Sequence, residues 1–213
     1  VNKLRFAFRK KLGIKKIKVG HAGTLDPLAT GLLIIAVGRM TKKIQNLTLL
    51  SKTYQGIMKF GMSTPSYDSE TEPDHYFTTK HINLSSIQKT IEEFTGAIEQ
   101  EVPKYSALKV SGKKLYKYAR QNQEVILPKR EVIIHAFNII NYSADDQCLS
   151  FEISCSKGTY IRSIAHEFGK TLNSGAYLKE LKRTSIGSYH LEDALSIDDA
   201  VTLISNMKVM GDE

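Results

Sequence analysis

The 213-residue sequence contains no apolar run that approaches the ~20 residues needed to cross a bilayer. Its basic N-terminus is not followed by the apolar segment of a signal peptide either. We therefore expect a cytoplasmic protein with no membrane contact. Cysteine is also scarce, with only Cys148 and Cys155. Their odd separation on one expected strand points them to opposite faces, which favours reduced thiols over a disulfide.

Metal and cofactor motifs are absent as well. No histidine pair has ligand spacing, and His166-Glu167 lacks the second histidine of the zinc-helix motif. The acids Asp68, Glu70, Glu72 and Asp74 resemble a calcium loop, but Pro73 stands where that loop needs glycine, so we interpret them as a solvated loop. The segment "VSGKKLY" lacks the first Gly and the Ser or Thr of a phosphate-binding loop. We expect chemistry by side chains and bound substrate, with no metal and no cofactor.

Positive charge is what the sequence has in excess, with a formal net charge of +8. Residues 1–18 carry eight Lys or Arg and no acid. Residues 103–120 carry six more, again with no acid, interleaved with Tyr105, Tyr116 and Tyr118. A solvated face is an alternative interpretation of each segment, and a weaker one for the second. Cations that follow phosphates and aromatic faces that stack on bases are what looped or single-stranded RNA requires, so we expect an RNA partner.

The hydrophobic pattern predicts a single α+β domain over residues 1–213, with a mixed, largely antiparallel sheet. The expected strands are Gly31–Gly38, Thr53–Phe60, Arg130–Tyr142 and Cys148–Cys155. The expected helices are Val1–Leu12, Thr41–Leu50, Ser85–Phe94 with a capping box of Ser85 and Gln88, Ser111–Gln121, Thr159–Leu172, and one capped by Ser196 that ends near Met207. Residues 61–80 are expected to form a polar loop.

The run "GHAGTLDPLATGLL", residues 20–33, raises the question of what Asp26 does. An Asp beside proline is commonly a turn or helix cap, and spacing alone leaves that role and a catalytic one equally open. A second segment, "SKGTYIRS" at 156–163, brings Lys157, Tyr160 and Arg162 together where a strand is expected to lead into a helix. An arginine partner would keep a buried aspartate ionised and nucleophilic.

Four segments together, "GHAGTLDPLATGLL", "KTYQGIMKFG", "VPKYSALKVSGKKLYKYAR" and "SKGTYIRSIAHEFG", resemble the TruB family of tRNA pseudouridine synthases. The match runs in order from about Lys18 to Tyr189. The resemblance implies the pseudouridine-synthase catalytic fold, with helices flanking the central sheet and a basic RNA-binding insertion. It also implies isomerisation of uridine 55 in the tRNA T-loop to pseudouridine, by an aspartate nucleophile acting on a flipped-out base.

The resemblance assigns roles to individual residues. Asp26 matches the nucleophile, Tyr54 the tyrosine that stacks on the target base and shuttles a proton, and Arg162 the partner of the aspartate. Whether the aspartate attacks C1′ directly or a glycal-type intermediate forms stays open. The other substrate-binding residues that we expect fall into three groups. His21 enters the T-loop of the tRNA, and Tyr160 and Leu181 line the uracil pocket. The residues that contact the rest of the RNA are Lys113, Lys114, Tyr116 and Lys157.

Family members usually begin with a strand that carries a Lys-Pro-x-Gly motif, whereas this chain begins at Val1 without an initiator Met. We expect that strand to be missing from this sequence, and the C-terminal PUA domain that family members often have to be either truncated or never present. The expected partner is the T-loop and T-stem of tRNA, bound by a monomer without an obligatory protein partner. One alternative is a catalytically inactive RNA-binding or tRNA-chaperone module, which the presence of Asp26, Tyr54, Tyr160 and Arg162 argues against. A second is guide-directed rRNA modification, which the absence of an extended tail disfavours.

Overall fold

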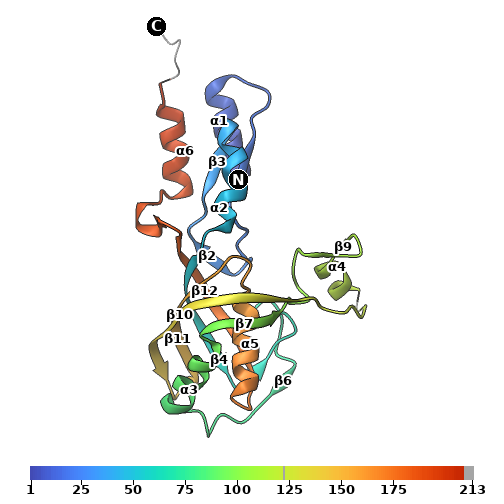
Figure 1. Cartoon of the computed structure of the whole chain (residues 1–213). Helices are drawn as coiled ribbons and strands as arrows, with labels where there is room; N and C mark the ends of the chain where they lie inside the picture. Colours follow the sequence, from blue (N-terminus) through green and yellow to red (C-terminus); the bar gives the residue numbers. More distant parts are fainter. Residues whose placement is uncertain (122, 209–213) are drawn as a thin grey trace.

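A seven-stranded sheet forms the centre of the computed structural model, which describes residues 1–121 and 123–208 (Figure 1). The strand order is β13-β12-β4-β11-β10-β7, with β2 paired to β12 off this path. The sheet strands are β2 Ala29–Gly31, β4 Lys52–Phe60, β7 Gly96–Glu101, β10 Lys129–Ser143, β11 Cys148–Cys155, β12 Ala176–Ile186 and β13 Tyr189–His190. Three short pairs lie outside it: β1 Val19–His21 with β3 Ile35–Val37, β5 Met62–Ser63 with β6 His75–Tyr76, and β8 Lys109–Val110 with β9 Lys113–Lys114.

Every pairing in the sheet is antiparallel except that of β2 with β12, which is parallel. This confirms the predicted mixed, largely antiparallel sheet. The helices are α1 Asn2–Leu12, α2 Ile44–Leu49, α3 Leu84–Phe94, α4 Leu115–Arg120, α5 Ile161–Thr171 and α6 Ile197–Asn206, with 3-10 turns η1 Gly38–Lys43 and η2 Leu191–Asp193. In the described residues no helix has the length and apolar character that crossing a membrane requires.

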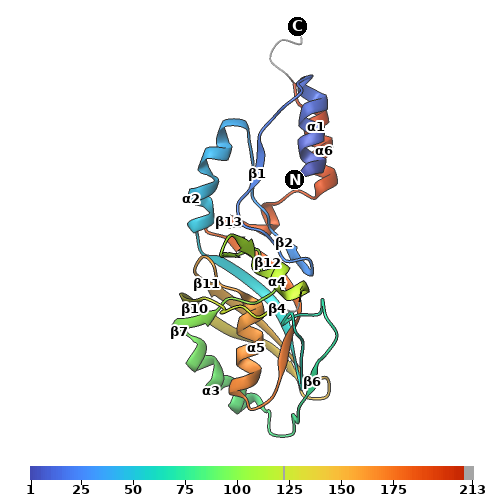
Figure 2. The same ribbon diagram turned by 90° about the vertical axis from the view of Figure 1, so that its right-hand side faces the viewer.

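The core lies between the sheet and the helices α3 and α5, which cover one of its faces (Figures 1 and 2). Strand β11 shows why, because every second residue from Leu149 to Cys155 is buried and the residues between them are not. On the helical side, the Phe168 ring stacks on Phe60 with centroids 6.2 Å apart and lies 5.5 Å from Phe137. Cys148 and Cys155 fall on opposite faces of this strand, as predicted.

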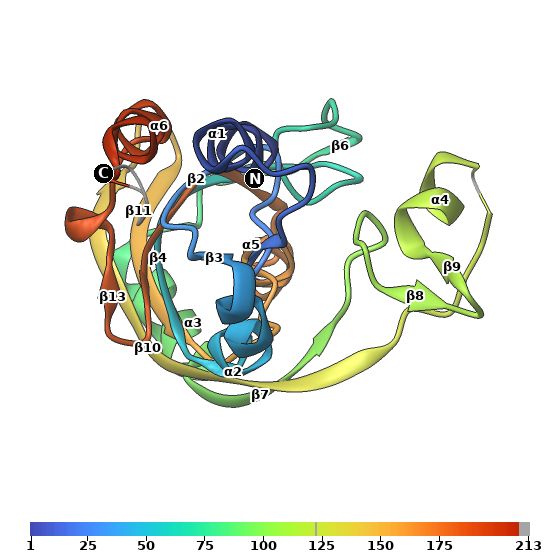
Figure 3. The same ribbon diagram turned by 90° about the horizontal axis from the view of Figure 1, so that it is seen from above.

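Two parts of the chain extend beyond this core. Helices α1 and α6 lie side by side past one end of the sheet, where Lys3 pairs with Asp198 (Figures 1 and 2). Strands β7 and β10 also run out past the sheet and carry a lobe of β8, β9 and α4, which stands apart from the body (Figure 3). We call residues 103–120 the basic lobe, because the six Lys and Arg of that segment all lie on it.

Several predicted elements are confirmed within a residue or two. They are the strands β4, β10 and β11 and the helices α1, α3, α5 and α6, the last of which is capped by Ser196 through its bond from the Asp199 amide. The predicted helix at 41–50 is present as the 3-10 turn η1 followed by α2. The predicted loop at 61–80 carries the small β5–β6 pair.

Three predictions about elements were wrong. The run Gly31–Gly38 is not one strand, because Gly31 takes a φ of 100° and directs the chain from β2 on β12 to β3 on β1. The helix Ser111–Gln121 shrinks to α4, since Ser111 and Gly112 form the left-handed turn between β8 and β9. Helix α3 is capped by Asn83 in a box with Ser86, and not by Ser85 with Gln88.

Candidate active site

A cavity of about 770 Å³ opens beside the sheet where three separate segments meet. Its walls come from residues 23–27 of the Asp26 run, from the strand-to-helix junction at 156–162, and from the basic lobe. Strands β4 and β12 contribute Tyr54, Leu181 and Arg183 from the sheet. The volume lies in the range of ~300–1,000 Å³ typical of ligand pockets, so a nucleoside-sized group can enter it.

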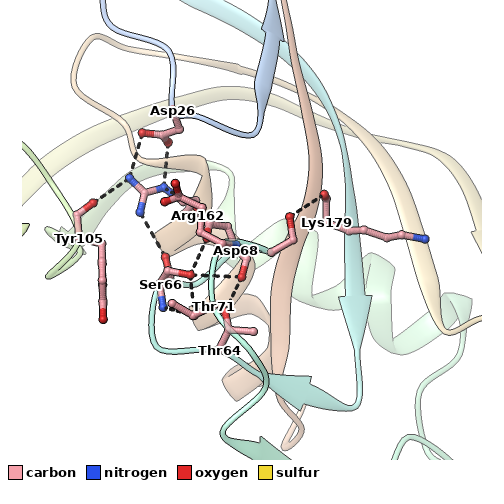
Figure 4. Close-up of polar contacts among 10 residues, drawn as sticks. Asp26, Thr64, Ser66, Asp68, Thr71, Tyr105, Arg162 and Lys179 are labelled. Carbon is pink, nitrogen blue, oxygen red and sulfur yellow. Dashed lines mark hydrogen bonds and ion pairs between the residues drawn. The ribbon is translucent and has the colours of Figure 1, made fainter. Parts of the chain in front are cut away.

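Asp26 projects its carboxylate into this cavity and keeps 31% of its side chain exposed. The Asp26 main-chain carbonyl makes the local turn by accepting the Ala29 amide at 2.9 Å. The carboxylate itself accepts two bonds from Arg162, from Nε at 2.8 Å and from Nη2 at 3.0 Å (Figure 4). The side chain is therefore paired with a cation and does not serve as a turn cap.

Arg162 lies at the start of α5 and is 3% exposed. Besides Asp26, its guanidinium donates to the Ser66 carbonyl at 3.2 Å and to the Tyr105 carbonyl at 3.1 Å. These bonds link the catalytic candidate Asp26 to the 61–80 loop and to the base of the basic lobe (Figure 4). The structure thus brings Asp26 and Arg162 together in the way that an ion pair between the two motifs requires.

The interpretation of the acids at 68–74 as a solvated loop was wrong for Asp68. Glu70, Glu72 and Asp74 are exposed, but Asp68 is completely buried. Its Oδ1 accepts from the Ser66 hydroxyl at 2.5 Å and from the Glu70 amide at 3.0 Å, while its Oδ2 lies 3.5 Å from Arg162 Nε and has no hydrogen bond within the described part of the chain. Sequence spacing carried no signal for this burial, because the chain folds back on Arg162 only through the tertiary structure.

Tyr67 explains how the loop holds Asp68 in place. Its φ of 65° is left-handed, a strained backbone for a bulky residue. Two contacts compensate for this strain. The Tyr67 ring stacks on His166 of α5 with centroids 3.8 Å apart, and the Tyr67 carbonyl accepts the Leu178 amide at 2.9 Å. Burial raises the pKa of the Tyr67 phenol to about 12 and lowers the pKa of His166.

Four predicted substrate residues, besides Asp26 and Arg162, line the cavity: Tyr54, Tyr116, Tyr160 and Leu181. Burial raises the pKa of the Tyr54 phenol, so this side chain stays protonated. The main chain of Tyr160 is fixed by the buried Gln100 side chain, which accepts its amide at 2.7 Å and donates to its carbonyl at 3.1 Å. The guanidinium of Arg130 lies 4.9 Å from the centre of the Tyr160 ring.

The other predicted residues lie outside the cavity wall. Lys113 donates to Gln121 and Gln123 and lies 4.4 Å from the Tyr118 ring centre, and Lys114 lies 5.6 Å from that of Tyr116. Lys157 is exposed beside Gly158. His21 ends β1, and its buried Nδ1 has no hydrogen-bond partner among the described residues. Their contact with RNA remains a prediction.

The structure adds cavity residues that the sequence did not indicate as site residues, including Lys52, Arg130, Arg183 and Glu70, which was interpreted as part of a solvated loop. Lys52 directly precedes the "TYQG" run and donates to the Thr48 and Leu50 carbonyls at 2.7 and 2.6 Å. Burial lowers the pKa of Lys52. Arg183 lies on β12, a strand absent from the sequence prediction, which is why this residue was overlooked.

Comparison with known proteins shows what the chain as a whole is similar to. Residues 9–161 match the family model described as TruB family pseudouridylate synthase (N terminal domain). The chain is 48% identical over 198 residues to the tRNA pseudouridine synthase B of Flavobacterium johnsoniae, covering 92% of this chain and 86% of that protein. It is 40% identical over 215 residues to the protein of the same name from Bacteroides thetaiotaomicron, covering 100% and 90%.

Solved structures share the fold at lower sequence identity. One is an H/ACA ribonucleoprotein bound to a substrate RNA containing 2′-deoxyuridine, with a TM-score of 0.65 and 23% identity over 94% of this chain. Another is the archaeal box H/ACA Nop10-Cbf5 complex, with a TM-score of 0.62 and 23% identity over 95% of this chain. This chain spans about half of each of those chains, 48% and 49%. The likeness confirms the predicted fold class.

Proposed function

The chain belongs to the TruB family of pseudouridylate synthases, and we propose that it isomerises uridine 55 in the T-loop of tRNA to pseudouridine with Asp26 as the nucleophile. Family membership makes it an isomerase. The observation that supports the finer proposal is the Asp26 carboxylate, which Arg162 holds by two hydrogen bonds at the wall of a cavity large enough for a flipped nucleotide. An aspartate ion-paired in this way is a nucleophile that needs no activating base.

The reaction conserves all atoms of the substrate. In the direct route, Asp26 attacks C1′, the C1′–N1 bond breaks, and the uracil leaves as an anion that turns within the cavity. The C5 carbon then attacks C1′, the carboxylate departs, C5 loses its proton, and N1 gains one. In the glycal-type route, a base removes the C2′ proton as the C1′–N1 bond breaks, which leaves a C1′=C2′ double bond and the uracil anion. The C5 carbon then attacks C1′, C2′ takes a proton back, C5 loses its proton, and N1 gains one. Both routes place Asp26 against the ribose and Tyr54, whose hydroxyl is protonated, beside the uracil.

The flipped base must lose its stacking partners, at a cost of a few kcal/mol. Tyr54, Tyr160 and Tyr116 line the cavity and offer aromatic faces in return. Cations at the rim, Arg120 and Arg130, would meet the flanking phosphates. The basic lobe lies next to this opening, so we propose that the T-loop and T-stem bind between it and the body (Figure 3).

Tritium release from tRNA transcript labelled at C5 of uridine tests this proposal. We expect one equivalent of tritium per tRNA from the wild type, and none from a transcript that has cytidine at position 55. Asp26→Asn keeps the side-chain shape but removes the nucleophile, and we expect its single-turnover rate to fall at least about 1,000-fold.

Asp145→Asn is a matched control, because Asp145 is exposed in the β10–β11 hairpin, away from the cavity. An active Asp26→Asn would exclude Asp26 as the nucleophile. Wild-type protein that binds tRNA but releases no tritium would instead support an RNA-binding module, the alternative function of the same fold.

A further inference from the structure

Among the described residues, Arg183 is the largest fully buried side chain, with 1% of its surface exposed. Burying a guanidinium is costly unless its charge is compensated. Within the described residues it forms no ion pair with a carboxylate, in contrast to Arg162. Its position on β12 at the cavity wall therefore calls for a role other than a stabilising salt bridge.

The hydrogen bonds of Arg183 go to the two ends of the segment that carries Asp26. Its Nε donates to the Leu32 carbonyl at 2.8 Å and its Nη2 to the Gly23 carbonyl at 3.1 Å. The Leu32 amide in turn donates to the Arg183 carbonyl at 2.9 Å. One residue thus fixes the entry and the exit of the 23–32 loop, with Asp26 between them.

The same residue faces Tyr54. Arg183 and Tyr54 are directly opposite each other in the antiparallel β4–β12 pair. Burial raises the pKa of the Tyr54 phenol, and the positive charge of Arg183 opposes that rise. One guanidinium therefore fixes the loop that carries Asp26 and belongs to the residue directly opposite Tyr54.

We propose that Arg183 is a positioning residue, which sets the separation of the Asp26 carboxylate from the Tyr54 hydroxyl by fixing the 23–32 loop to β12. This inference rests on the role proposed for Asp26. Attack at C1′ requires the carboxylate to be aligned with the carbon within a few tenths of an ångström, and a displacement of about 1 Å can cost about 100-fold in rate. Because Arg183 is buried, it has no surface to offer to phosphates, and its effect falls on chemistry rather than on RNA binding.

Two substitutions of Arg183 distinguish its positioning of the loop from the effects of its charge and of its packing. Arg183→Lys keeps the charge but cannot reach both carbonyls, and Arg183→Met keeps much of the stem without any donor. We expect the single-turnover rate at saturating tRNA to fall about 100-fold in Arg183→Lys and further in Arg183→Met, with the Kd for tRNA within about twofold of wild type. Lys182→Met is the matched control, because Lys182 is the exposed neighbour that points to the opposite face of β12.

Amide hydrogen exchange of the folded variants supplies a readout that does not depend on activity. We expect amides within 23–32 to exchange faster in Arg183→Lys, while those of β10 and β11 keep their wild-type rates. Unchanged exchange in the loop, or a wild-type rate in Arg183→Met, would overturn the inference. If the wild type makes no pseudouridine but the loop still loosens, the proposed function fails and the structural part of the inference stands.

Discussion

Asp26 and Asp68 share one guanidinium, and only Asp26 reaches the cavity. The Asp68 carboxylate lies 3.5 Å from Arg162 Nε, so we expect its charge to orient Arg162 and to affect the proposed reaction through it. We expect Asp68→Asn to lower the single-turnover rate about 10- to 100-fold, the usual effect of losing a supporting partner of an active group. Its Oδ1 can still accept from Ser66 and Glu70, so the fold should survive. Rapid-quench tritium release at saturating tRNA measures the rate.

Glu72→Gln provides the control for Asp68→Asn, because Glu72 is an exposed acid of the same loop. Its rate should equal that of wild type. If the Kd for tRNA rises in Asp68→Asn while the rate stays unchanged, Asp68 does not position Arg162 for the reaction. That result would indicate a disturbed basic lobe instead.

We expect His166 to make the stability of the folded protein dependent on pH. Burial lowers its pKa, while the neighbouring Glu167 opposes the shift. An unfolded histidine titrates near pH 6.5, so between the lowered pKa and 6.5 the unfolded chain binds more protons than the folded one. Stability therefore falls as the pH drops through that window. We expect His166→Phe, which keeps a ring on Tyr67, to reduce the fall of Tm between about pH 7.5 and 5.5. An equally steep fall in the variant would assign the effect to another group.

At the level of elements, the short parallel contact of β2 with β12 is what delivers the Asp26 loop to the sheet. It depends on Gly31, where an added Cβ would lie 2.3 Å from the Arg183 carbonyl oxygen and 2.8 Å from its amide nitrogen. Both atoms are main chain and cannot move aside without breaking the pairing. We expect Gly31→Ala to lower the free energy of unfolding by about 2–4 kcal/mol and to abolish most activity. Urea unfolding followed by circular dichroism measures the first effect.

Gly13→Ala is the control for Gly31→Ala, because it introduces left-handed backbone strain without a steric clash. Gly13 ends α1 with a φ of 63°, and no atom lies within 4 Å of the Cβ position. The cost there should be about 1 kcal/mol, with wild-type chemistry. Equal losses of stability at the two glycines would show that the close approach of β2 to β12 contributes little.

Strand β11 has a regular period and was predicted correctly, whereas β12 lacks one and was missed. Strand β11 alternates throughout, whereas bulges at Leu178/Glu180 and Arg183/Ser185 break the alternation of β12 and place consecutive charges in a central strand. The continuous apolar run after Asp26 favoured one buried strand, but the left-handed Gly31 divides it between two partners. Such features follow from neighbours distant in sequence, which local patterns do not record.

The same limit applies to the site. Asp26 and Arg162 were predicted because each lies in a distinctive motif, and the structure joins them. Asp68 lies in a segment that was interpreted as a solvated loop, and Arg183 in one without a predicted element. Both are fully buried, Asp68 against Arg162 and Arg183 at the cavity wall. The roles proposed for Asp68 and Arg183 depend on the burial of their charged groups away from water, which only the folded chain creates.

For the molecule as a whole, positive charge is concentrated in two segments, residues 1–18 and the basic lobe. The basic lobe stands away from the sheet (Figure 3), and its residues Tyr105, Tyr116 and Arg120 line the cavity. We therefore expect its lysines to contact phosphates of the proposed tRNA substrate. Each lysine–phosphate contact releases counterions, which makes binding depend on salt. Reversing the charge of Lys113 and Lys114 should therefore weaken tRNA binding most at low salt and leave the rate at saturation nearly intact.

Fluorescence titrations of tRNA at several salt concentrations measure this. If both lysines contact phosphate, the slope of log Kd against log salt should decrease by about two in Lys113→Glu with Lys114→Glu. Lys80→Glu with Lys89→Glu makes the same change of charge near α3, at the far end of the body, and should alter the slope little (Figure 1). Long-range attraction depends on the net charge, which both double variants change equally. Identical salt slopes in the two double variants would therefore mean that the tRNA does not contact Lys113 and Lys114. A loss of binding that does not vary with salt would indicate a misfolded lobe, since Lys113 also bonds Gln121 and Gln123.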